Sequence, residues 1–414
     1  MDDYTALHRH LGQPRGPVDD DLLDAAVRAH LEETDDLDWK KPPRSEGNRA
    51  KFIDKDFLED VAAFANADGG TIVIGVDEED SAATERIDAG EWSDGDLRTL
   101  RSVVASQLHP PVLGLRTHRL NNGDKRALIV VVPPSLDRPH FLQSTHKNNQ
   151  QYYAARIRVG SGSRWMTERE IAEAYRRRFA EQRDAAEALN RLFEGAFVGR
   201  GRPRGVVVAR PRIPLNAPAE LTRENARRLM QVADREAANM MRRKSWRPLD
   251  SIDLDRIRPG LRRWIGPAKY WDEAGSQAVL RQDGAITLAA TLDGHYEAAG
   301  VKLDEGTFAS WRLEALVVDA LCLVRAVASR TGSVEYEVRV GLAPWRNELR
   351  MVAADFDPGL RDNHAEVIQI FEPVDTTITL DAGLSGLLTQ TEQLARDCIN
   401  QGGIDELMLL RNMV

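Results

Sequence analysis

The chain has 414 residues, of which 42% are hydrophobic and 29% are charged, and this composition is sufficient for ordinary globular cores in two or three domains. A formal net charge of −9 excludes a protein that is uniformly basic, as a coat for nucleic acid would be. The two cysteines, Cys322 and Cys398, exclude a disulfide framework and a zinc site of four thiolates.

The first part of the chain predicts helices that alternate with strands. The run of β-branched residues in TIVIGVD is typical of a strand buried on both faces, and the glycine pair before it predicts a tight turn after a helix. In chain order we expect a loose leader over 1–18, a helix over 19–31, a strand over 35–40, a loop over 41–54, a helix over 55–66 and a strand over 71–77.

The following segment predicts more strands, again ending in a helix. Thr167 and Glu170 form a capping box, which predicts where that helix begins. Before it we expect a helix over 94–108, a hairpin of strands over 112–120 and 126–133, a second hairpin over 139–143 and 152–159, and a turn over 160–165.

The second half of the chain has a different pattern. Residues 181–263 are interpreted as a basic linker that contains a short strand and an arginine-rich helix. We expect a separate α+β domain over 264–414, which makes the whole chain α+β. Its expected elements are strands over 285–292 and 296–303, a helix over 308–330, strands over 334–342, 349–355 and 366–372, and a helix over 383–401.

Charge is strongly segregated along the chain. Residues 1–100 carry a net charge of −15, residues 101–155 of +5, residues 156–263 of +12 and residues 264–414 of −11. A basic middle between acidic ends favours an anionic partner, although charged helices are often only solvated faces.

Three stretches of the sequence resemble one known family. Residues 33–40, ETDDLDWK, resemble the Schlafen signature Glu-Ser-x-x-x-Glu-Phe-Lys. Residues 61–77, VAAFANADGGTIVIGVD, and residues 152–161, YYAARIRVGS, are similar to the helix, turn, strand and closing hairpin of the same domain. The chain is identified by this resemblance as a Schlafen AlbA-type domain protein, with that domain over 19–180.

The resemblance implies a nucleic-acid-binding fold and, in nuclease members, three carboxylates that hold a divalent metal and cleave RNA. Carried over by position, these carboxylates are Glu33, Asp38 and Asp77. Asp38 stands where the family has Glu, but all three positions remain acidic. The implied substrate is structured RNA such as transfer RNA, and the implied context is defence against phage.

The chemistry of these residues agrees with the resemblance. Three hard oxygen ligands at the ends of adjacent strands suit Mg²⁺ or Mn²⁺. Lys40 follows Asp38 by two residues, so on a strand both side chains share one face, where the amine can assist catalysis. The alternative is that Glu33 and Asp38 are ordinary surface acids.

A second candidate site lies on the strand over 152–159. Alternation places Tyr152, Arg156 and Arg158 on one face, which favours base stacking and phosphate contacts, and Arg164 follows in a glycine-rich turn. A solvated strand face paired with acids is the alternative. Asn66, Gly69 and Gly70 are interpreted as a structural turn, since no P-loop motif supports ATP hydrolysis.

The sequence therefore predicts a metal-dependent endoribonuclease, with a non-catalytic nucleic-acid-binding or ATP-binding regulator as the alternative. A single visible copy of the domain leads us to expect a homodimer. The acidic start lacks the apolar core of a secretory signal, and the longest apolar run, 128–132, is far shorter than the ~20 residues of a membrane span. We expect a soluble, cytoplasmic protein.

Overall fold

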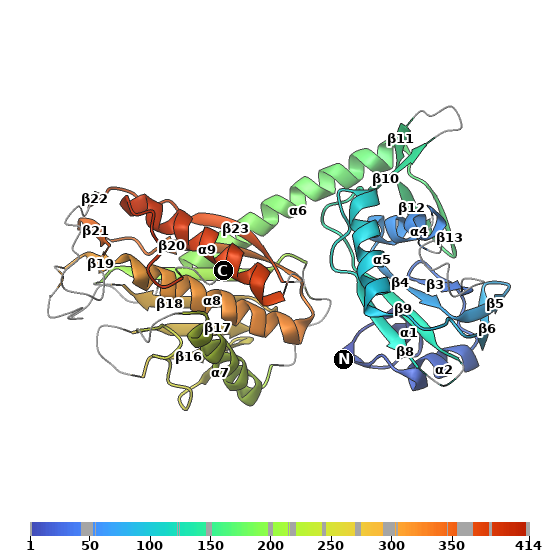
Figure 1. Cartoon of the computed structure of the whole chain (residues 1–414), viewed down its shortest axis with the longest axis horizontal. Coiled ribbons are helices and arrows are strands. Elements are labelled where there is room, and N and C mark those ends of the chain that lie inside the picture. The colour runs from blue at the N-terminus through green and yellow to red at the C-terminus, as the bar shows by residue number, and fades with distance from the viewer. Residues whose placement is uncertain are drawn as a thin grey trace. The chain divides into compact units, whose positions relative to one another are not determined.

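The structure is a computed structural model that divides into two compact units, Met1–Arg183 and Asp184–Val414 (Figure 1). The structure describes residues 2–42, 53, 55–121, 123, 125–145, 151–197, 202–213, 215, 221–241, 246–269, 275–292, 303, 305–345, 347–353, 367–380 and 383–410.

A four-stranded sheet lies at the centre of unit 1. Its order is β3 (Leu37–Lys40), β4 (Gly70–Ile74), β9 (Ala127–Val132) and β8 (Arg116–Leu120). The β3–β4 pair is parallel, and the other two pairs are antiparallel. One face packs on α4 (Lys55–Asn66) and α5 (Asp94–Gln107), the other on α1 (Ala6–His10) and α2 (Asp20–Arg28) (Figure 1).

The central strand confirms the pattern that predicted it. All five residues of β4 are buried, because helices cover the sheet on both faces. Alternate residues of β4 therefore enter different cores, with Ile72 and Ile74 beneath α4 and Val73 beneath the N-terminal helices. The result is a mixed sheet inside a three-layer α+β unit.

Small sheets and the first part of one long helix, which continues past Arg183, complete unit 1. The small sheets are β1 (Asp2–Asp3) with β2 (Gly16–Pro17), β5 (Val76–Glu79) with β6 (Ala82–Arg86), the three strands β11 (Gln151–Ala154), β10 (Phe141–Thr145) and β7 (Leu108–His109), and β12 (Arg156–Val159) with β13 (Gly162–Trp165). The predicted capping box is confirmed at the start of α6 (Glu168–Glu194), where the Glu170 carboxylate accepts from the backbone N–H of Thr167 at 2.8 Å.

The expected loose leader is instead part of the unit 1 core. Ala6 and Leu7 are fully buried, and the backbone N–H of Ala6 donates to the Thr71 hydroxyl at 3.2 Å. Glycine and proline in this stretch shape turns between short elements, while the few apolar residues between them fill the space beside β4. Apolar side chains outweighed the local turn signals here.

Unit 2 is built on a seven-stranded antiparallel sheet. Its order is β15 (Arg258–Gly260), β16 (Arg263–Gly266), β17 (Gln277–Arg281), β18 (Ile286–Thr291), β14 (Arg204–Pro211), β20 (Glu335–Leu342) and β23 (Val374–Thr379). One face packs on α7 (Arg223–Met240), α8 (Ser310–Thr331) and α9 (Gly383–Ile399), and a short sheet joins β19 (Thr307–Ala309), β21 (Leu349–Val352) and β22 (Val367–Ile368).

The segment interpreted as a basic linker, 181–263, belongs to unit 2 from Asp184 onward, and its expected strand and arginine-rich helix are present as β14 and α7. β14 pairs with β18 on one side and β20 on the other, and Val206 and Val208 pack under the end of α6. α7 contributes Met230 to the main core of unit 2. Arginines dominate the composition of this segment, but its apolar minority has helix and strand spacing, which decides its place.

One expected strand cannot be compared with the structure, and another is shorter than expected. The strand over 296–303 falls outside the described residues apart from Leu303, and the strand over 366–372 is shortened to β22.

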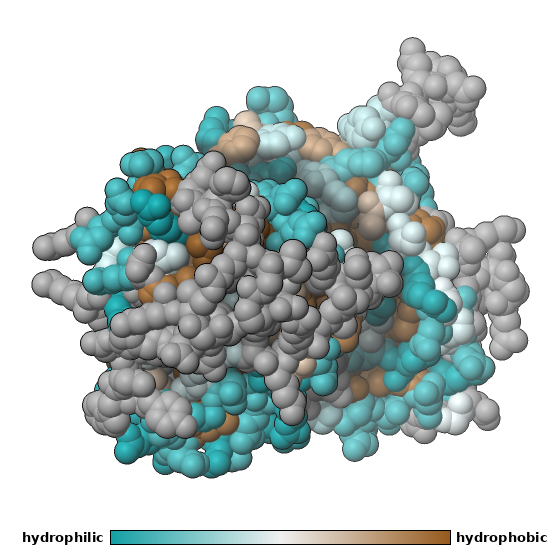
Figure 2. Space-filling model, turned by 60° about the vertical axis from the view of Figure 1, so that its left-hand side comes forward, coloured by the Kyte–Doolittle hydropathy of each residue, from teal (hydrophilic) through white to brown (hydrophobic). Residues whose placement is uncertain are grey.

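Among the described residues, no helix is long and apolar enough to cross a membrane. On the side of the molecule drawn in Figure 2, hydrophilic residues make up most of the described surface, and hydrophobic residues show as scattered patches.

Candidate functional site

The acidic signature lies on β3, the edge strand of the central sheet. Leu37 and Trp39 are buried toward α1 and α2, so Asp38 and Lys40 share the opposite face, as the strand period predicts. The Lys40 ammonium lies 3.1 Å from the Asp38 carboxylate and 2.7 Å from the carboxylate of Asp60, which comes from α4. Three charged groups therefore meet between the sheet and this helix.

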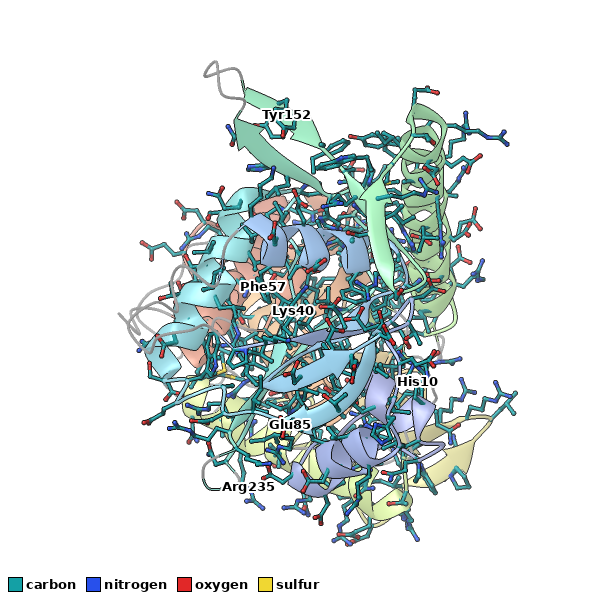
Figure 3. The ribbon with its side chains drawn as sticks, turned by 90° about the vertical axis from the view of Figure 1, so that its right-hand side faces the viewer. His10, Lys40, Phe57, Glu85, Tyr152 and Arg235 are labelled. Atoms are coloured by element: carbon teal, nitrogen blue, oxygen red, sulfur yellow. The ribbon has the colours of Figure 1, made fainter. Side chains whose placement is uncertain are left out.

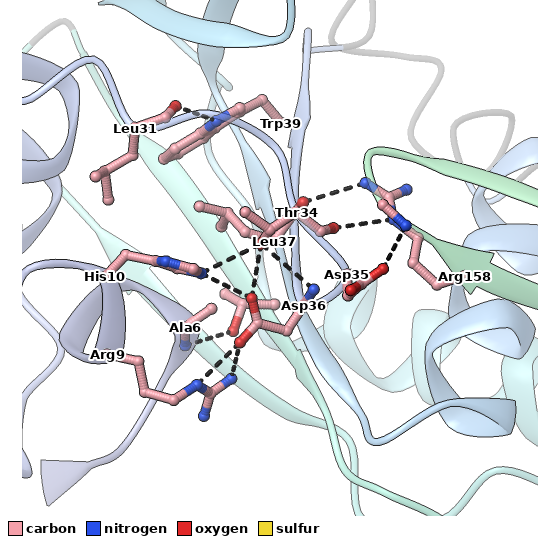
Figure 4. Close-up of polar contacts among 12 residues, drawn as sticks. Ala6, Arg9, His10, Leu31, Thr34, Asp35, Asp36, Leu37, Trp39 and Arg158 are labelled. Atoms are coloured by element: carbon pink, nitrogen blue, oxygen red, sulfur yellow. Dashed lines mark hydrogen bonds and ion pairs between the residues drawn. The ribbon is translucent and has the colours of Figure 1, made fainter.

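Arg158 on β12 completes this cluster from the other side. Its guanidinium donates to the Asp38 carboxylate at 2.8 Å. It also donates to the backbone carbonyls of Thr34 at 3.2 Å and Leu37 at 3.1 Å (Figure 4). The guanidinium carbon also lies 5.0 Å from the centre of the Phe64 ring. The side chain is only 2% exposed. Arg158, expected at a nucleic-acid surface, is therefore an internal bridge between β12 and β3.

Glu33 lies beside this bridge and has an unusual pKa. Its carboxylate accepts the backbone N–H of Trp39 at 3.0 Å and lies 3.8 Å from the Arg158 guanidinium. Burial, followed by the nearby charges of Asp38 and Glu78, raises the pKa of Glu33 to about 7. Chemically, this position can take up or release one proton near neutral pH.

Lys40 and Asp60 have shifted pKa values for related reasons. Burial alone would lower the pKa of Lys40, but the carboxylates of Asp38 and Asp60 raise it above its usual value. Burial, together with the charge of Asp38, raises the pKa of Asp60 against the effect of Lys40. The cluster thus holds cations tightly against carboxylates that are largely buried.

Asp77 does not join Glu33 and Asp38. It lies on β5 with its side chain 34% exposed, and the Lys41 ammonium is 2.7 Å from its carboxylate. This contact lowers the pKa of Asp77. Within the described ranges, no group of three or more His, Cys, Asp or Glu side chains is arranged to hold a metal ion.

The three acids therefore do not fit a divalent ion in this arrangement. A metal at Asp38 would compete with Arg158 and Lys40, which already neutralise that carboxylate. The sequence spacing correctly placed Asp38 and Lys40 on one face of a strand. It did not show that Arg158, from a distant hairpin, reaches the same carboxylate.

The expected face of Tyr152, Arg156 and Arg158 is interrupted at Ala155. β11 pairs with β10, whereas β12 pairs with β13, so the alternation does not continue through the buried Ala155. Tyr152 lies on the β10–β11 hairpin, away from Lys40 (Figure 3). Its neighbour Tyr153 is the exposed aromatic, with a side chain that is 57% exposed.

The β12–β13 hairpin presents an exposed aromatic residue that the sequence did not single out. Trp165 is 45% exposed, and the guanidinium carbon of its cross-strand partner Arg156 lies 4.6 Å from its ring centre. Arg156 is held in turn by an ion pair with Glu59. The neighbouring Arg164 is 50% exposed and pairs with Glu170 at 2.6 Å. We call Trp165 and Arg156 together the Trp165 platform. An aromatic residue directly opposite an arginine on a hairpin is the sequence signal that could have identified it.

The turn residues have the structural role expected of them, with one addition. A side chain at Gly69 would lie 2.7 Å from the Val132 carbonyl, and one at Gly70 would lie 2.2 Å from the Phe64 ring. The Asn66 amide donates to the carbonyls of His140 at 3.0 Å and Arg156 at 2.9 Å. Asn66 therefore anchors the closing hairpin to α4, a long-range role that the local turn signal does not show.

Comparisons with known proteins give a family match that lies within unit 1. Residues 33–167 match the family model described as Schlafen, AlbA_2. No curated protein matches the chain. The N-terminal domain of a RecG-related protein from Nitrosomonas europaea is 26% identical over 36% of this chain and 92% of its own, with a TM-score of 0.24.

A crystal structure of a protein from Corynebacterium diphtheriae is 14% identical over 52% of this chain and 39% of its own, with a TM-score of 0.26. TM-scores this low do not establish a shared overall fold, so the identification depends on the family match. That match indicates a function related to nucleic acid. Residues 33–167 therefore form a Schlafen AlbA_2 domain, as the resemblance in the sequence predicted.

Proposed function

We propose that this protein binds nucleic acid through the β12–β13 hairpin of unit 1. One observation carries the proposal: Trp165 is 45% exposed, and the guanidinium carbon of Arg156 lies 4.6 Å from the centre of its ring. Bases stack on such exposed aromatic side chains whatever their sequence, and an arginine stacked on the same ring adds positive charge. The ion pair with Glu59 keeps Arg156 in place before any ligand arrives.

The surroundings of Trp165 favour a polyanion. Arg164, on the same strand, is half exposed, and its pairing with Glu170 at the surface is weak enough for a phosphate to replace it. The match to the AlbA_2 family favours the same class of ligand. RNA, with transfer RNA as the first candidate, is the specific ligand that we propose.

The test is binding of labelled RNA and DNA to the full chain, measured by fluorescence anisotropy at low salt. One stacked base contributes about 1–3 kcal/mol, so Trp165→Ala should weaken binding by roughly 5- to 150-fold. Tyr4→Ala is the matched control, because Tyr4 also has an arginine over its ring, with Arg9 at 5.8 Å, but lies in the N-terminal segment. Equal effects of the two substitutions, or a wild type that binds no nucleic acid, would refute the proposal.

A second candidate function is cleavage of structured RNA. The observation that favours it is the convergence of Glu33, Asp38 and Lys40, where one carboxyl titrates near neutral pH. The arrangement does not fit Mg²⁺ or Mn²⁺, so we assign no step to a metal. Fragments that appear from total RNA with the wild type, but not with Glu33→Gln or Asp38→Asn, would support this candidate. If RNA stays intact in Mg²⁺, Mn²⁺ and EDTA alike while binding is retained, cleavage is refuted and nucleic-acid binding is the function that remains.

The homodimer, the cytoplasmic location and the role in phage defence remain predictions. Light scattering after size-exclusion chromatography measures the first directly. A mass of one chain would refute the dimer and would leave nucleic-acid binding untouched, because the Trp165 platform is complete within one chain.

A further inference from the structure

Unit 2 has a basic edge that its own fold does not explain. The β15–β16 hairpin forms one end of the seven-stranded sheet, and its turn exposes Leu261 by 86%. The exposed residues Arg258, Leu261, Arg262 and Arg263 are here called the basic edge. From Arg256 to Lys269 the sequence contains no aspartate or glutamate.

The register of the strands places the arginines on one face of the sheet. Arg258 is opposite Ile265, and Arg263 is opposite both Gly260 and Arg281, so these arginines project from the same side. The other side carries Trp264 and Leu280, which pack into the core of unit 2. A row of arginines therefore crosses three neighbouring strands on the face that turns away from this core.

Gly260 lets Arg263 lie across the hairpin. A side chain at Gly260 would come within 2.9 Å of both Cγ and Nε of Arg263. The stem of Arg263 therefore packs over the neighbouring strand rather than extending into solvent. This contact orients the guanidinium along the sheet face.

The basic edge lacks the negative charge that usually accompanies such a row. In the described part of the chain, no ion pair or side-chain hydrogen bond holds Arg258, Arg262 or Arg263. Arg281 lies directly opposite Arg263 and pairs with Asp283 at 3.4 Å, so the counter-charge is missing at Arg258, Arg262 and Arg263 and not at Arg281. The arrangement is explained if an anionic ligand supplies the missing charge.

We propose that the basic edge binds the phosphate backbone of the same nucleic acid that contacts unit 1. This inference rests on the proposed function and extends it to a second contact site. Arginine forks donate two parallel hydrogen bonds to a phosphate, which favours nucleic acid over a ligand that offers only isolated carboxylates. Leu261 at the turn supplies an apolar contact for a base or sugar.

The experiment compares two double substitutions in the full chain. Arg258→Glu with Arg263→Glu alters the basic edge. Arg228→Glu with Arg235→Glu makes the same charge change at exposed positions of α7, which packs on the opposite face of the sheet. Binding of a long single-stranded RNA is measured by anisotropy between 50 and 200 mM salt, and circular dichroism confirms that each variant is folded.

We expect the basic-edge variant to bind at least about tenfold more weakly, with a salt slope smaller by about 1.4, since each phosphate contact to a single strand contributes about 0.7. The α7 variant should resemble the wild type. Arg258→Gln with Arg263→Gln should fall between them, because it removes charge without reversing it.

The outcomes separate this inference from the proposed function. If the basic-edge variant binds like the wild type while Trp165→Ala weakens binding, the inference fails and the proposed function stands. If the wild type binds no nucleic acid, the proposed function fails as well. Binding to vesicles that contain phosphatidylserine is measured as well. If the basic-edge variant loses vesicle binding but keeps RNA binding, the edge binds membranes and the inference is overturned.

Discussion

The buried contact between Arg158 and Asp38 allows the sharpest test of how unit 1 is built. We expect Arg158→Met to destabilise unit 1 strongly, because Met keeps much of the side-chain volume but removes the charge. The substitution leaves Asp38 buried, with a side chain that is only 5% exposed. It also removes the donor to the carbonyls of Thr34 and Leu37, which contact the same guanidinium.

The expected size follows from these contacts. Removing one partner of a buried ion pair costs about 3–5 kcal/mol, because the remaining charge is left without compensation. Lys40 stays 3.1 Å from Asp38, so the cost should lie near the lower limit, about 3 kcal/mol. For a unit of this size that corresponds to a decrease in Tm of roughly 6–12 °C.

Urea denaturation followed by circular dichroism measures this loss, and Arg164→Met is the control. Arg164 also pairs with a carboxylate, but its side chain is 50% exposed, so its loss should have far less effect on stability than the loss of Arg158. Adding Asp38→Asn to Arg158→Met should restore part of the stability, since no uncompensated carboxylate then remains. Equal costs for the two arginine substitutions would show that Arg158 is not the bridge described here.

Three further substitutions test other parts of the structure. Burial raises the pKa of Glu33 from 4.5 to about 7, so the stability that its protonated form contributes is complete below pH 4.5 and is lost as the pH rises through 7. Relative to the wild type, the free energy of unfolding of Glu33→Gln should therefore increase by about 1–2 kcal/mol between pH 5 and pH 8 in urea titrations. A difference that does not change with pH would contradict this. Gly70→Ala places a methyl group against the Phe64 ring and should cost about 1–3 kcal/mol by thermal denaturation, so an unchanged Tm would count against the packing. In unit 2, the buried Glu314 carboxylate anchors the segment at 408–409 by accepting the backbone N–H of Met408 at 2.9 Å and of Leu409 at 2.8 Å. Glu314→Gln should lower the free energy of unfolding by about 1–3 kcal/mol and speed hydrogen exchange at these two amides. Unchanged exchange would exclude this anchoring role.

Much of the fold follows from local pattern alone. The first part of the strand expected over 71–77, observed as β4 at 70–74, the turn that precedes it and the capping box of α6 were predictable, because each depends on residues within one or two turns of chain. The end of that strand was not, because the chain leaves the sheet at Gly75 and Asp77 lies on β5. The long apolar helix of the second half was also predictable and is observed as α8. The signature residues placed the AlbA_2 region over nearly the same residues as the family match.

The candidate site depended on contacts between distant parts of the chain. Spacing put Asp38 and Lys40 on one face of a strand, but only tertiary structure brought Arg158 to Asp38, across 120 residues. Asp77, although close in sequence to the buried strand, turned outward with β5 to meet Lys41. Local patterns cannot encode such partners, since these depend on how strands and helices pack.

What the sequence by itself determined is therefore the identity of the domain, the main elements of the first unit and the chemical types present at β3. Only the tertiary structure decided which charges neutralise one another and which remain available. It paired Arg158 with Asp38 in the interior, stacked Arg156 on Trp165 at the surface, and left Arg263 at the edge of unit 2 without a counter-charge among the residues described. The physical reason is that burial and the choice of partner set the electrostatic role of a side chain, and both are properties of the packed chain.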